Sequence, residues 1–401
     1  MTAARLHTSP NALAPHYSRF RVGHRLLLTG HSHQAWPDVG LAAQQQAWLD
    51  AADLADRKWG RVGDVADRVR ARWSALLHDR GGIVALGQNT HELVSRFLSA
   101  LPLWGRHARP RLVTTSGEFH TIRRQLARLG EVAGVELVKV EAYPAATLAE
   151  RLAAAVDART SAVLVSSVLF ETSAIVPDLS AVAAACVRDG AELLVDAYHH
   201  VGVVPFDVHG MGLSAAFVLG GGYKYCQLGE GNCFMRVPPD CHLRPVLTGW
   251  FSEFGALAAA TAPGEVRYGE GATRWAGATY DPVSHYRAVA VFDFFEAQGL
   301  TPALLREISR HQTALIVEQL HGLDLPATVG SVEPLTPDER AGFVSVRTPH
   351  AQRLVEALLA AGVHSDARGE FLRLGPAPYV SDSQLDEAVD RLARLATALP
   401  H

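Results

Sequence analysis

The chain has 401 residues, of which 48% are hydrophobic and 19% are charged, and its formal net charge is -4 at pH 7. This composition supplies enough apolar residues for a large core and excludes a globally disordered chain. A negative net charge without a polybasic block excludes nucleic acid or an anionic membrane as the main partner. We also expect no membrane span, because no apolar run approaches ~18 residues, and no secretory signal.

The cysteines set an expectation for the cellular compartment. Cys186, Cys226, Cys233 and Cys241 show neither C-x-x-C spacing nor a disulfide-dense framework. We therefore expect a reduced, cytoplasmic protein.

Taken in chain order, the pattern predicts an N-terminal arm, a large domain and a smaller domain. Residues 1–40 are expected to form an arm that joins the small domain, with a short strand at 25–29. Residues 39–77 show a helical pattern with interruptions near Gly60 and Gly63. The large domain, 41–298, then alternates short apolar runs with amphipathic segments, which predicts an α/β fold with a mostly parallel central sheet and helices on both faces.

The last third has a different character. A loop-rich region follows Pro238-Pro239, and a long helix is predicted over 283–298. Beyond Gly299 the pattern predicts helices at 302–320, 351–361 and 382–399 and strands at 343–347 and 371–374. Residues 299–401 are therefore expected to form a small α+β domain.

Two predicted strand ends carry the candidate chemistry. The apolar run 193–195 ends at Asp196, and the run 215–219 is followed by three glycines, Tyr223 and Lys224. Because ligands bind beyond the carboxyl ends of parallel strands, Asp196 and Lys224 are expected to share one site. A lysine that forms a Schiff base and an acid that pairs with a ring nitrogen suit pyridoxal 5'-phosphate (PLP). Partial burial would lower the pKa of Lys224 and favour this chemistry.

Each of these residues alone also has an ordinary structural explanation, and it is their combination that predicts a cofactor site. Asn89 and Thr90 open a helix directly after a strand, where unpaired N–H groups attract phosphate, although every capped helix shows this signal. Phe119 is a candidate to stack on the ring, with a place in the core as the alternative. His199 is a candidate to reach the ring's phenolic oxygen or a substrate carboxylate.

Together these residues resemble class V of the PLP-dependent aminotransferase superfamily (fold type I), and within it most closely the kynureninases. Tyr223-Lys224-Tyr225, with Gly229 and Gly231 following, is similar to the kynureninase lysine motif. Further segments resemble the family in the same chain order: Asn89-Thr90, Phe119 with Thr121, Asp196 with His199, Trp250-Phe251, Arg274 with Thr279, and Asp366, Arg368 and Arg373.

The resemblance implies a homodimeric fold-type-I enzyme with PLP on Lys224 and a small amino-acid substrate. It implies catalytic roles for Lys224, Asp196 and Tyr223, and an arginine clamp on the substrate α-carboxylate at Arg373. It also implies that Thr279 reaches the site of the neighbouring subunit. The implied cofactor-binding residues are Lys224, Asp196, His199, Asn89, Thr90, Phe119, Tyr223, Trp250 and Thr279. The implied reaction is hydrolytic Cβ–Cγ cleavage or a related reaction on another side chain.

The departures from the kynureninase pattern concern the substrate. Where kynureninases carry Gly-Asn-Ser-Leu-Gly, residues 30–34 read GHSHQ, and where they carry Asn-Tyr-Arg/Lys-Thr-Gly, residues 169–173 read LFETS. Ser252-Glu253 follow Trp250-Phe251 in place of a small residue and a histidine. A changed pocket around an unchanged cofactor site predicts PLP with a different substrate side chain.

Other functions stay open at this point. The same cofactor site supports an aminotransferase or a C–S lyase, whereas a cysteine desulfurase needs a later loop cysteine, and none follows Cys241. A metal-dependent hydrolase would use His31 and His33, whose i, i+2 spacing on a strand points both side chains to one side. A silent binding protein is disfavoured, because binding alone needs no Schiff-base lysine at position 224.

Overall fold

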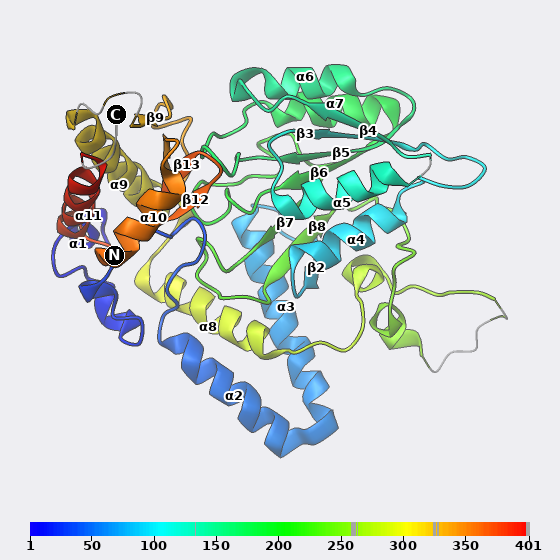
Figure 1. Ribbon diagram of the computed structural model, residues 1–401. Coiled ribbons are helices and arrows are strands. Elements are labelled where there is room, and N and C mark those ends of the chain that lie inside the picture. The colour runs from blue at the N-terminus through cyan, green and yellow to red at the C-terminus, as the bar shows by residue number, and fades with distance from the viewer. Residues whose placement is uncertain (133, 258–261, 263, 324–325, 327–328, 398–401) are drawn as a thin grey trace.

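The computed structural model describes residues 1–132, 134–257, 262, 264–323, 326 and 329–397. Figure 1 shows a large α/β part around one sheet and a smaller part that brings segments from both ends of the chain together.

The central sheet has seven strands. Their order is β2 (Ile83–Gly87), β8 (Cys233–Val237), β7 (Phe217–Gly221), β6 (Glu192–Asp196), β5 (Thr160–Ser166), β3 (Arg111–Thr115) and β4 (Glu136–Val140). Strands β7, β6, β5, β3 and β4 are parallel, and β8 runs antiparallel to both of its neighbours. The parallel strands therefore end at one edge.

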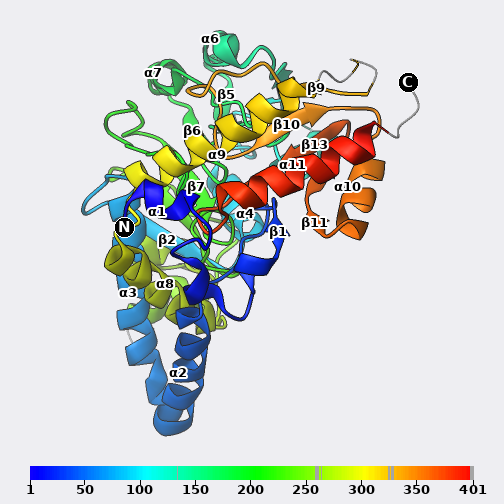
Figure 2. The same ribbon diagram turned by 90° about the vertical axis from the view of Figure 1, so that its left-hand side faces the viewer.

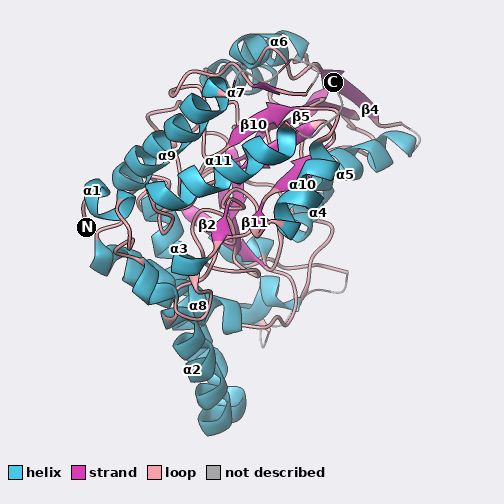
Figure 3. Ribbon diagram, turned by 60° about the vertical axis from the view of Figure 1, so that its left-hand side comes forward, coloured by secondary structure: helices cyan, strands magenta, loops and turns pink. Residues whose placement is uncertain are grey.

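Helices cover both faces of this sheet (Figures 1 and 3). One face packs against α4 (Thr90–Ala100) and α5 (His120–Glu131). The other face packs against α3 (Lys58–Leu76), α6 (Leu148–Ala155), α7 (Leu179–Asp189) and α8 (Val283–Gln298).

Strand β5 shows why the pattern of a parallel sheet is a continuous apolar run. All of its residues are buried. Ala162 and Leu164 face the core of α4 and α5, whereas Val163 and Val165 face the opposite core. Because both faces are covered by helices, both sets of alternating side chains must be apolar.

The helices α2 (Val39–Leu54) and α3 form a pair that extends away from the sheet (Figure 1). The expected interruptions near Gly60 and Gly63 are wrong, since both glycines lie inside α3. The break occurs at 55–57, where Ala55 has a φ of 51°. A glycine costs a helix only about 1 kcal/mol, and the buried stripe that includes Trp73 outweighs this cost.

The smaller part is built from both ends of the chain. Its antiparallel sheet has the order β12 (Asp366–Arg368), β13 (Phe371–Leu374), β10 (Val344–Arg347) and β9 (Ser331–Val332). Its helices are α1 (Ala3–His7), α9 (Pro302–Gly322), α10 (Ala351–Ala360) and α11 (Asp382–Ala396), and α9 lies alongside α11 (Figure 2). Strand β1 (Leu26–Leu27) pairs in parallel with β11 (Val363–His364), so the N-terminal segment is joined to this part by main-chain hydrogen bonds.

The predicted fold class is confirmed: a mostly parallel sheet with helices on both faces is followed by a smaller α+β unit. Within the described residues, no helix by itself has the length and apolar character to cross a membrane. Helices α8 and α9 meet those criteria only when taken together, and they are bent by 80° relative to each other.

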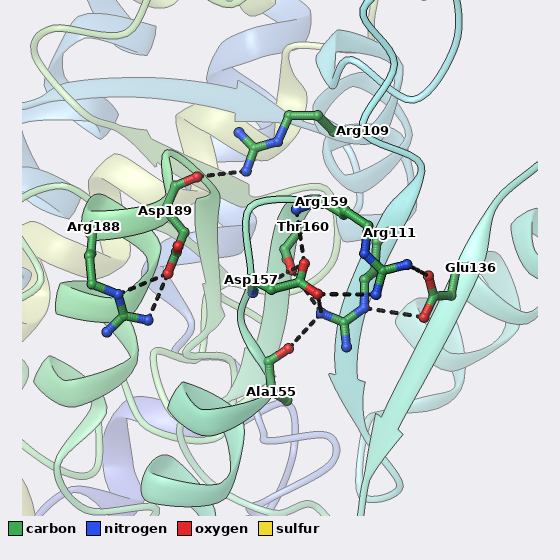
Figure 4. Close-up of polar contacts among 9 residues, drawn as sticks. All are labelled: Arg109, Arg111, Glu136, Ala155, Asp157, Arg159, Thr160, Arg188 and Asp189. Atoms are coloured by element: carbon green, nitrogen blue, oxygen red, sulfur yellow. Dashed lines mark hydrogen bonds and ion pairs between the residues drawn. The ribbon is translucent and has the colours of Figure 1, made fainter.

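Ion pairs join the starts of three strands at the amino edge of the sheet (Figure 4). The Arg111 Nε atom lies 3.2 Å from Glu136, and Arg159 Nη1 lies 2.9 Å from the other oxygen of the same carboxylate. Asp157 pairs with both arginines, at 3.0 Å and 3.1 Å. Most of these groups are solvent-exposed, so the network fixes local register more than it adds stability.

The ion pair between Arg236 on β8 and Asp79 is, by contrast, buried. The Arg236 side chain on β8 is 0% exposed, and its Nε donates to Asp79 Oδ2 at 2.7 Å. Its Nη1 donates to the carbonyls of Ser214 and Ala216. Asp79 therefore neutralises a guanidinium that has no access to water.

We expect Asp79→Ala to lower the free energy of unfolding by about 3–5 kcal/mol, because it leaves the Arg236 charge buried without a partner. Urea denaturation measures the change. Glu136→Gln, which breaks two exposed pairs, serves as the control and should cost about 1 kcal/mol or less. Equal small losses in both variants would contradict this account of the buried pair.

Candidate active site

A cavity of about 210 Å³ opens at the carboxyl ends of the parallel strands. It is lined by residues at or after the ends of β2, β3, β5 and β6, by four residues from the segment between β7 and β8, and by the first residue of β8. The lining residues are Gln88, Asn89, Thr90, Phe119, Thr121, Ser166, Val168, Phe170, Asp196, Tyr198, His199, Tyr223, Lys224, Glu230, Gly231 and Cys233. Seven predicted site residues are therefore together: Lys224, Asp196, Tyr223, His199, Asn89, Thr90 and Phe119.

Lys224 lies in the segment after β7, at the centre of this cavity. Its Nζ is 2.7 Å from Nε2 of His199, 4.6 Å from the ring centre of Tyr198 and 5.3 Å from that of Phe119. Burial lowers the pKa of Lys224 to about 7, although the charge of Asp196 opposes this shift. The amine is thus partly neutral near neutral pH, as a nucleophile must be.

Three glycines, 220–222, precede Tyr223 and Lys224, and the Lys224 residue is only 5% exposed. The glycines are required by close packing: a Cβ at Gly221 would lie 2.3 Å from the Tyr198 hydroxyl, and one at Gly222 would lie 2.5 Å from Leu228. The absence of a Cβ at these positions therefore lets the backbone of β7 and the residue after it approach Tyr198 and Leu228 closely.

Asp196 ends β6 and is buried beside the lysine. Its Oδ1 accepts a hydrogen bond of 2.9 Å from the Tyr198 amide. Burial raises the pKa of Asp196, while the Tyr198 hydrogen bond and the Lys224 charge oppose that rise. Among the described residues no cation forms an ion pair with Asp196, so this carboxylate faces the cavity without a fixed counter-charge.

His199 and Tyr223 lie on either side of the lysine. Burial and the Lys224 charge hold the pKa of His199 well below its usual range, so it is a neutral imidazole. Its Nδ1 is buried and has no hydrogen-bond partner among the described residues. Burial raises the pKa of Tyr223 to about 12, so its hydroxyl is a proton donor and not a base at neutral pH. The Tyr223 ring stacks on His33 with centroids 4.9 Å apart.

The amino end of α4 forms the opposite wall. Asn89 is its N-cap, and its side chain accepts from Glu92 N at 2.9 Å. The N–H groups of Thr90 and His91 precede the first helical hydrogen bonds and point out of the helix end. A helix of eleven residues places its positive dipole end here, which favours an anion.

Three predicted site residues lie outside this cavity. Trp250 is 47% exposed and packs on Phe251 and Phe254. Thr279 is also exposed, in the segment before α8. Neither lines the cavity of its own chain.

Arg373, the third, is buried on β13 close to the lysine. Its Nε donates to Asp366 Oδ1 at 2.9 Å, its Nη2 donates to Asp366 Oδ2, and its Nη1 donates to the Phe170 carbonyl at 2.6 Å. Asp366 also accepts from His31 Nε2 at 2.7 Å. Burial pushes the pKa of Asp366 up, but His31 and Arg373 hold it well below its usual range. Arg373 thus keeps one free N–H on each terminal nitrogen.

Comparison with known proteins identifies relatives along nearly the whole chain. Residues 305–392 match the family described as the kynureninase C-terminal domain. The kynureninase of Pseudomonas fluorescens is 28% identical over 402 residues, covering 96% of this chain and 92% of that protein. The kynureninase of Deinococcus radiodurans is 29% identical over 362 residues, covering 86% and 83%.

The chain is similar to kynureninases. This confirms the resemblance predicted from the sequence.

Solved structures show the same fold at lower sequence identity. A mutant of C-DES with glycine covalently linked to its PLP cofactor has a TM-score of 0.81 and 17% identity, covering 94% of this chain and 98% of that one. The apo cysteine desulfurase of Thermococcus onnurineus has a TM-score of 0.77 and 15% identity, covering 94% and 95%. The fold-type-I architecture is therefore confirmed.

Several residues of the kynureninase-like site were missed from the sequence. Tyr198 packs its ring against Lys224 and anchors Asp196, and Ser166 ends β5 beside Asp196. Glu118 is 1% exposed and hydrogen-bonds Ser166. The only available signal was position, since Ser166 lies near the end of the strand predicted at 162–168 and Glu118 directly precedes Phe119.

The structure does not support the alternative of a metal site at His31 and His33. His31 is fully buried and bound to Asp366, whereas the His33 side chain is 69% exposed and stacks on Tyr223. One other group within the described residues brings three potential ligands together: His7, His311 and Asp382. Its two imidazoles are stacked 3.7 Å apart at 11°, and parallel rings cannot both direct in-plane lone pairs at one ion.

We expect the amine of Lys224 to react with trace acetic anhydride with a midpoint near pH 7, because the neutral form is the reactive one. The chain has three lysines, Lys58, Lys139 and Lys224, so mass spectrometry of peptides separates the signals. Lys58 and Lys139 act as internal references for reagent decay. A midpoint for Lys224 near the ordinary lysine value of ~10.4 would contradict the geometry described.

Proposed function

We propose that this chain is a PLP-dependent enzyme that acts on a small L-amino acid, by kynureninase-like hydrolytic Cβ–Cγ cleavage or a related reaction on another side chain. One observation carries the proposal. Asp196 and Lys224 come from neighbouring strand ends and line one buried cavity, yet they form no ion pair with each other in the described chain. Similarity to kynureninases over 96% of the chain supports it.

The residues present fit PLP. A space between a buried carboxylate and a buried amine suits a ring that pairs with the acid through nitrogen and with the lysine through its aldehyde carbon. Phe119 stands 5.3 Å from the amine on one side of that space. The unpartnered His199 Nδ1 and the open end of α4 supply groups for the polar substituents of the ring and for its phosphate.

When bound, PLP supplies an electron sink that makes the substrate Cα–H acidic. The chain's own residues then do the rest. Asp196 holds a proton on the ring nitrogen, because a buried carboxylate favours a cation beside it. Lys224 moves the proton at the substrate Cα, for which a pKa of about 7 suits it at neutral pH. Tyr223 donates a proton at the substrate side chain, since its hydroxyl stays protonated.

Arg373 is proposed to bind the substrate α-carboxylate. Asp366 fixes the guanidinium in place through two hydrogen bonds, and the two free N–H groups are left for a carboxylate. A fixed guanidinium orients the substrate at low entropic cost. His31 supports this arrangement from behind by holding Asp366.

We further propose a homodimer in which Trp250 and Thr279 reach the cofactor site of the neighbouring subunit. Both residues are exposed and do not line the cavity of their own chain. Exposed apolar side chains accompany them, including Phe254 at 46% and Leu257 at 52%. Such a surface is typical of an interface.

The four free cysteines agree with the proposed cytoplasmic location.

The substrate side chain is proposed to differ from kynurenine. Among the departures at 30–34 and 169–173, Phe170 lines the cavity, and His31 bonds Asp366, the partner of the proposed substrate arginine Arg373. A C–S lyase is the second candidate, since it uses the same cofactor site and needs no cysteine nucleophile. Incubation of the PLP-loaded enzyme with L-kynurenine, L-cystine and the common amino acids separates the two: alanine as product supports the first and pyruvate the second.

Lys224→Ala should abolish the visible absorbance that appears when purified protein is incubated with PLP, because no other amine faces the cavity in the described residues. Lys139→Ala, at an exposed position, is the control and should keep the absorbance. The same absorbance in the Lys224 variant would refute the assignment.

Arg373→Lys should raise KM for the amino-acid substrate about 10- to 100-fold, because an ammonium cannot replace a bidentate guanidinium. Steady-state kinetics measure this effect. Arg340→Lys is the control, since Arg340 is also buried but bonds the Leu335 carbonyl outside the cavity. If KM rises by the same factor for amines that lack a carboxylate as for the amino acid, the role given to Arg373 is wrong.

A further inference from the structure

A second carboxyl group is buried directly behind the cavity. Glu118 lies in the segment between β3 and α5, next to Phe119, and is 1% exposed. It does not line the cavity, so it does not touch a ligand there. Its position is set by the ends of β3 and β5, which are neighbours in the sheet, and β5 pairs on its other side with β6 and its Asp196.

Glu118 is held by hydroxyls and an amide and not by a cation. Its Oε1 accepts from Thr115 Oγ1 at 2.7 Å and from Ser166 N at 3.1 Å. Its Oε2 bonds Ser166 Oγ at 2.7 Å. No ion pair reaches Glu118 in the described part of the chain. A buried carboxyl without a counter-ion is costly, so its presence needs an explanation.

Ser166 connects this carboxyl to the proposed cofactor site. It lines the cavity, and in the sheet register it lies directly opposite Asp196. Glu118 binds both the amide and the hydroxyl of Ser166, so neither can turn freely toward the cavity. Ser166, which lines the cavity, is therefore held in place by Glu118, which does not line it.

We propose that Glu118 is a positioning residue of the PLP site: it fixes Ser166 and places a second acidic group behind Asp196, and the pair raises the proton affinity of the groups that hold the cofactor. This inference rests on the proposed function. Asp196 and Glu118 both lack an internal cation in the described chain. When both carboxyls are ionised, a positive charge in the cavity, on Lys224 or on the ring nitrogen of bound PLP, would compensate them.

The electrostatics agree with this arrangement. Burial raises the pKa of Glu118 to about 7, the hydrogen bonds from Ser166 and Thr115 oppose the rise, and the charge of Asp196 adds to it. The titratable groups that line the cavity with Asp196 are Lys224, His199, Tyr198, Tyr223, Glu230 and Cys233. A negative charge at Glu118 stabilises the protonated form of a nearby basic group.

The test compares Glu118→Gln with the parent protein, both loaded with PLP. Glutamine keeps an oxygen for Thr115 and the Ser166 amide, and its NH₂ donates to the Ser166 hydroxyl, so the packing is preserved. The loss of one buried negative charge should lower the midpoint of the pH titration of the visible absorbance by roughly half to one pH unit. A residue that only packs would leave this midpoint unchanged.

Asp50→Asn is the matched control. Asp50 is another buried carboxylate that accepts hydrogen bonds from neutral groups, at 2.8 Å from the Tyr286 hydroxyl and 2.7 Å from Gln46, with the exposed Arg61 at 3.9 Å, and it lies outside the cavity. This variant should lower the thermal midpoint of unfolding without shifting the absorbance titration. A shift of the same size in Asp50→Asn would overturn the assignment to Glu118.

Ser166→Ala supplies a second measurement if Glu118→Gln fails to fold. It removes the hydroxyl link and keeps the buried carboxyl, and we expect the dissociation constant for PLP to rise about 3- to 10-fold. Unchanged PLP binding by this variant would overturn the proposal. If the parent protein gives no visible absorbance with PLP, the proposed function fails; if it does and Glu118→Gln titrates like the parent, only the role of Glu118 fails.

Discussion

The structure depends on one constraint: a carboxylate and an amine are buried within one cavity and yet kept apart. Water does not solvate Asp196 or Lys224 well, and burial is the main cause that moves both pKa values toward neutrality. If the two groups met, they would form an ion pair and the cavity between them would close. Their separation is maintained by the parallel sheet, which ends β6 and β7 side by side but sends the chain onward in different directions.

The surroundings of the cavity serve that separation. Tyr198 bonds Asp196 through its amide and places its ring beside the lysine. The glycines of 220–222 leave room for these residues, and Glu118 with Ser166 closes the floor. In the small domain, Asp366 on β12 lies opposite Arg373 on β13 and holds its guanidinium by hydrogen bonds. The large domain thus lines the cavity that is proposed to bind the cofactor, and the small domain holds the arginine that is proposed to bind the substrate carboxylate.

Similarity to kynureninases identifies the relatives of the chain, whereas the geometry of the site concerns its chemistry. Similarity over most of the chain establishes the relatives, and the fold is shared with structures as distant as 15% identity. Neither the similarity nor the shared fold specifies the substrate.

The sequence by itself determined the sheet strands, the long helix 283–298 and the pair Asp196 and Lys224, because short apolar runs that end in Asp or Gly are local signals. The other five cavity residues that were predicted (Asn89, Thr90, Phe119, His199 and Tyr223) depended on the resemblance to a family as well. It placed the break of the α2–α3 pair wrongly, since an exposed glycine costs less than the buried stripe of α3 supplies. Only the tertiary structure decided that Glu118 lies beneath Ser166, that Asp366 occupies the fork of Arg373, and that His31 and His33 have separate partners. These facts depend on contacts between segments far apart in sequence, and no local pattern encodes which buried polar groups will meet.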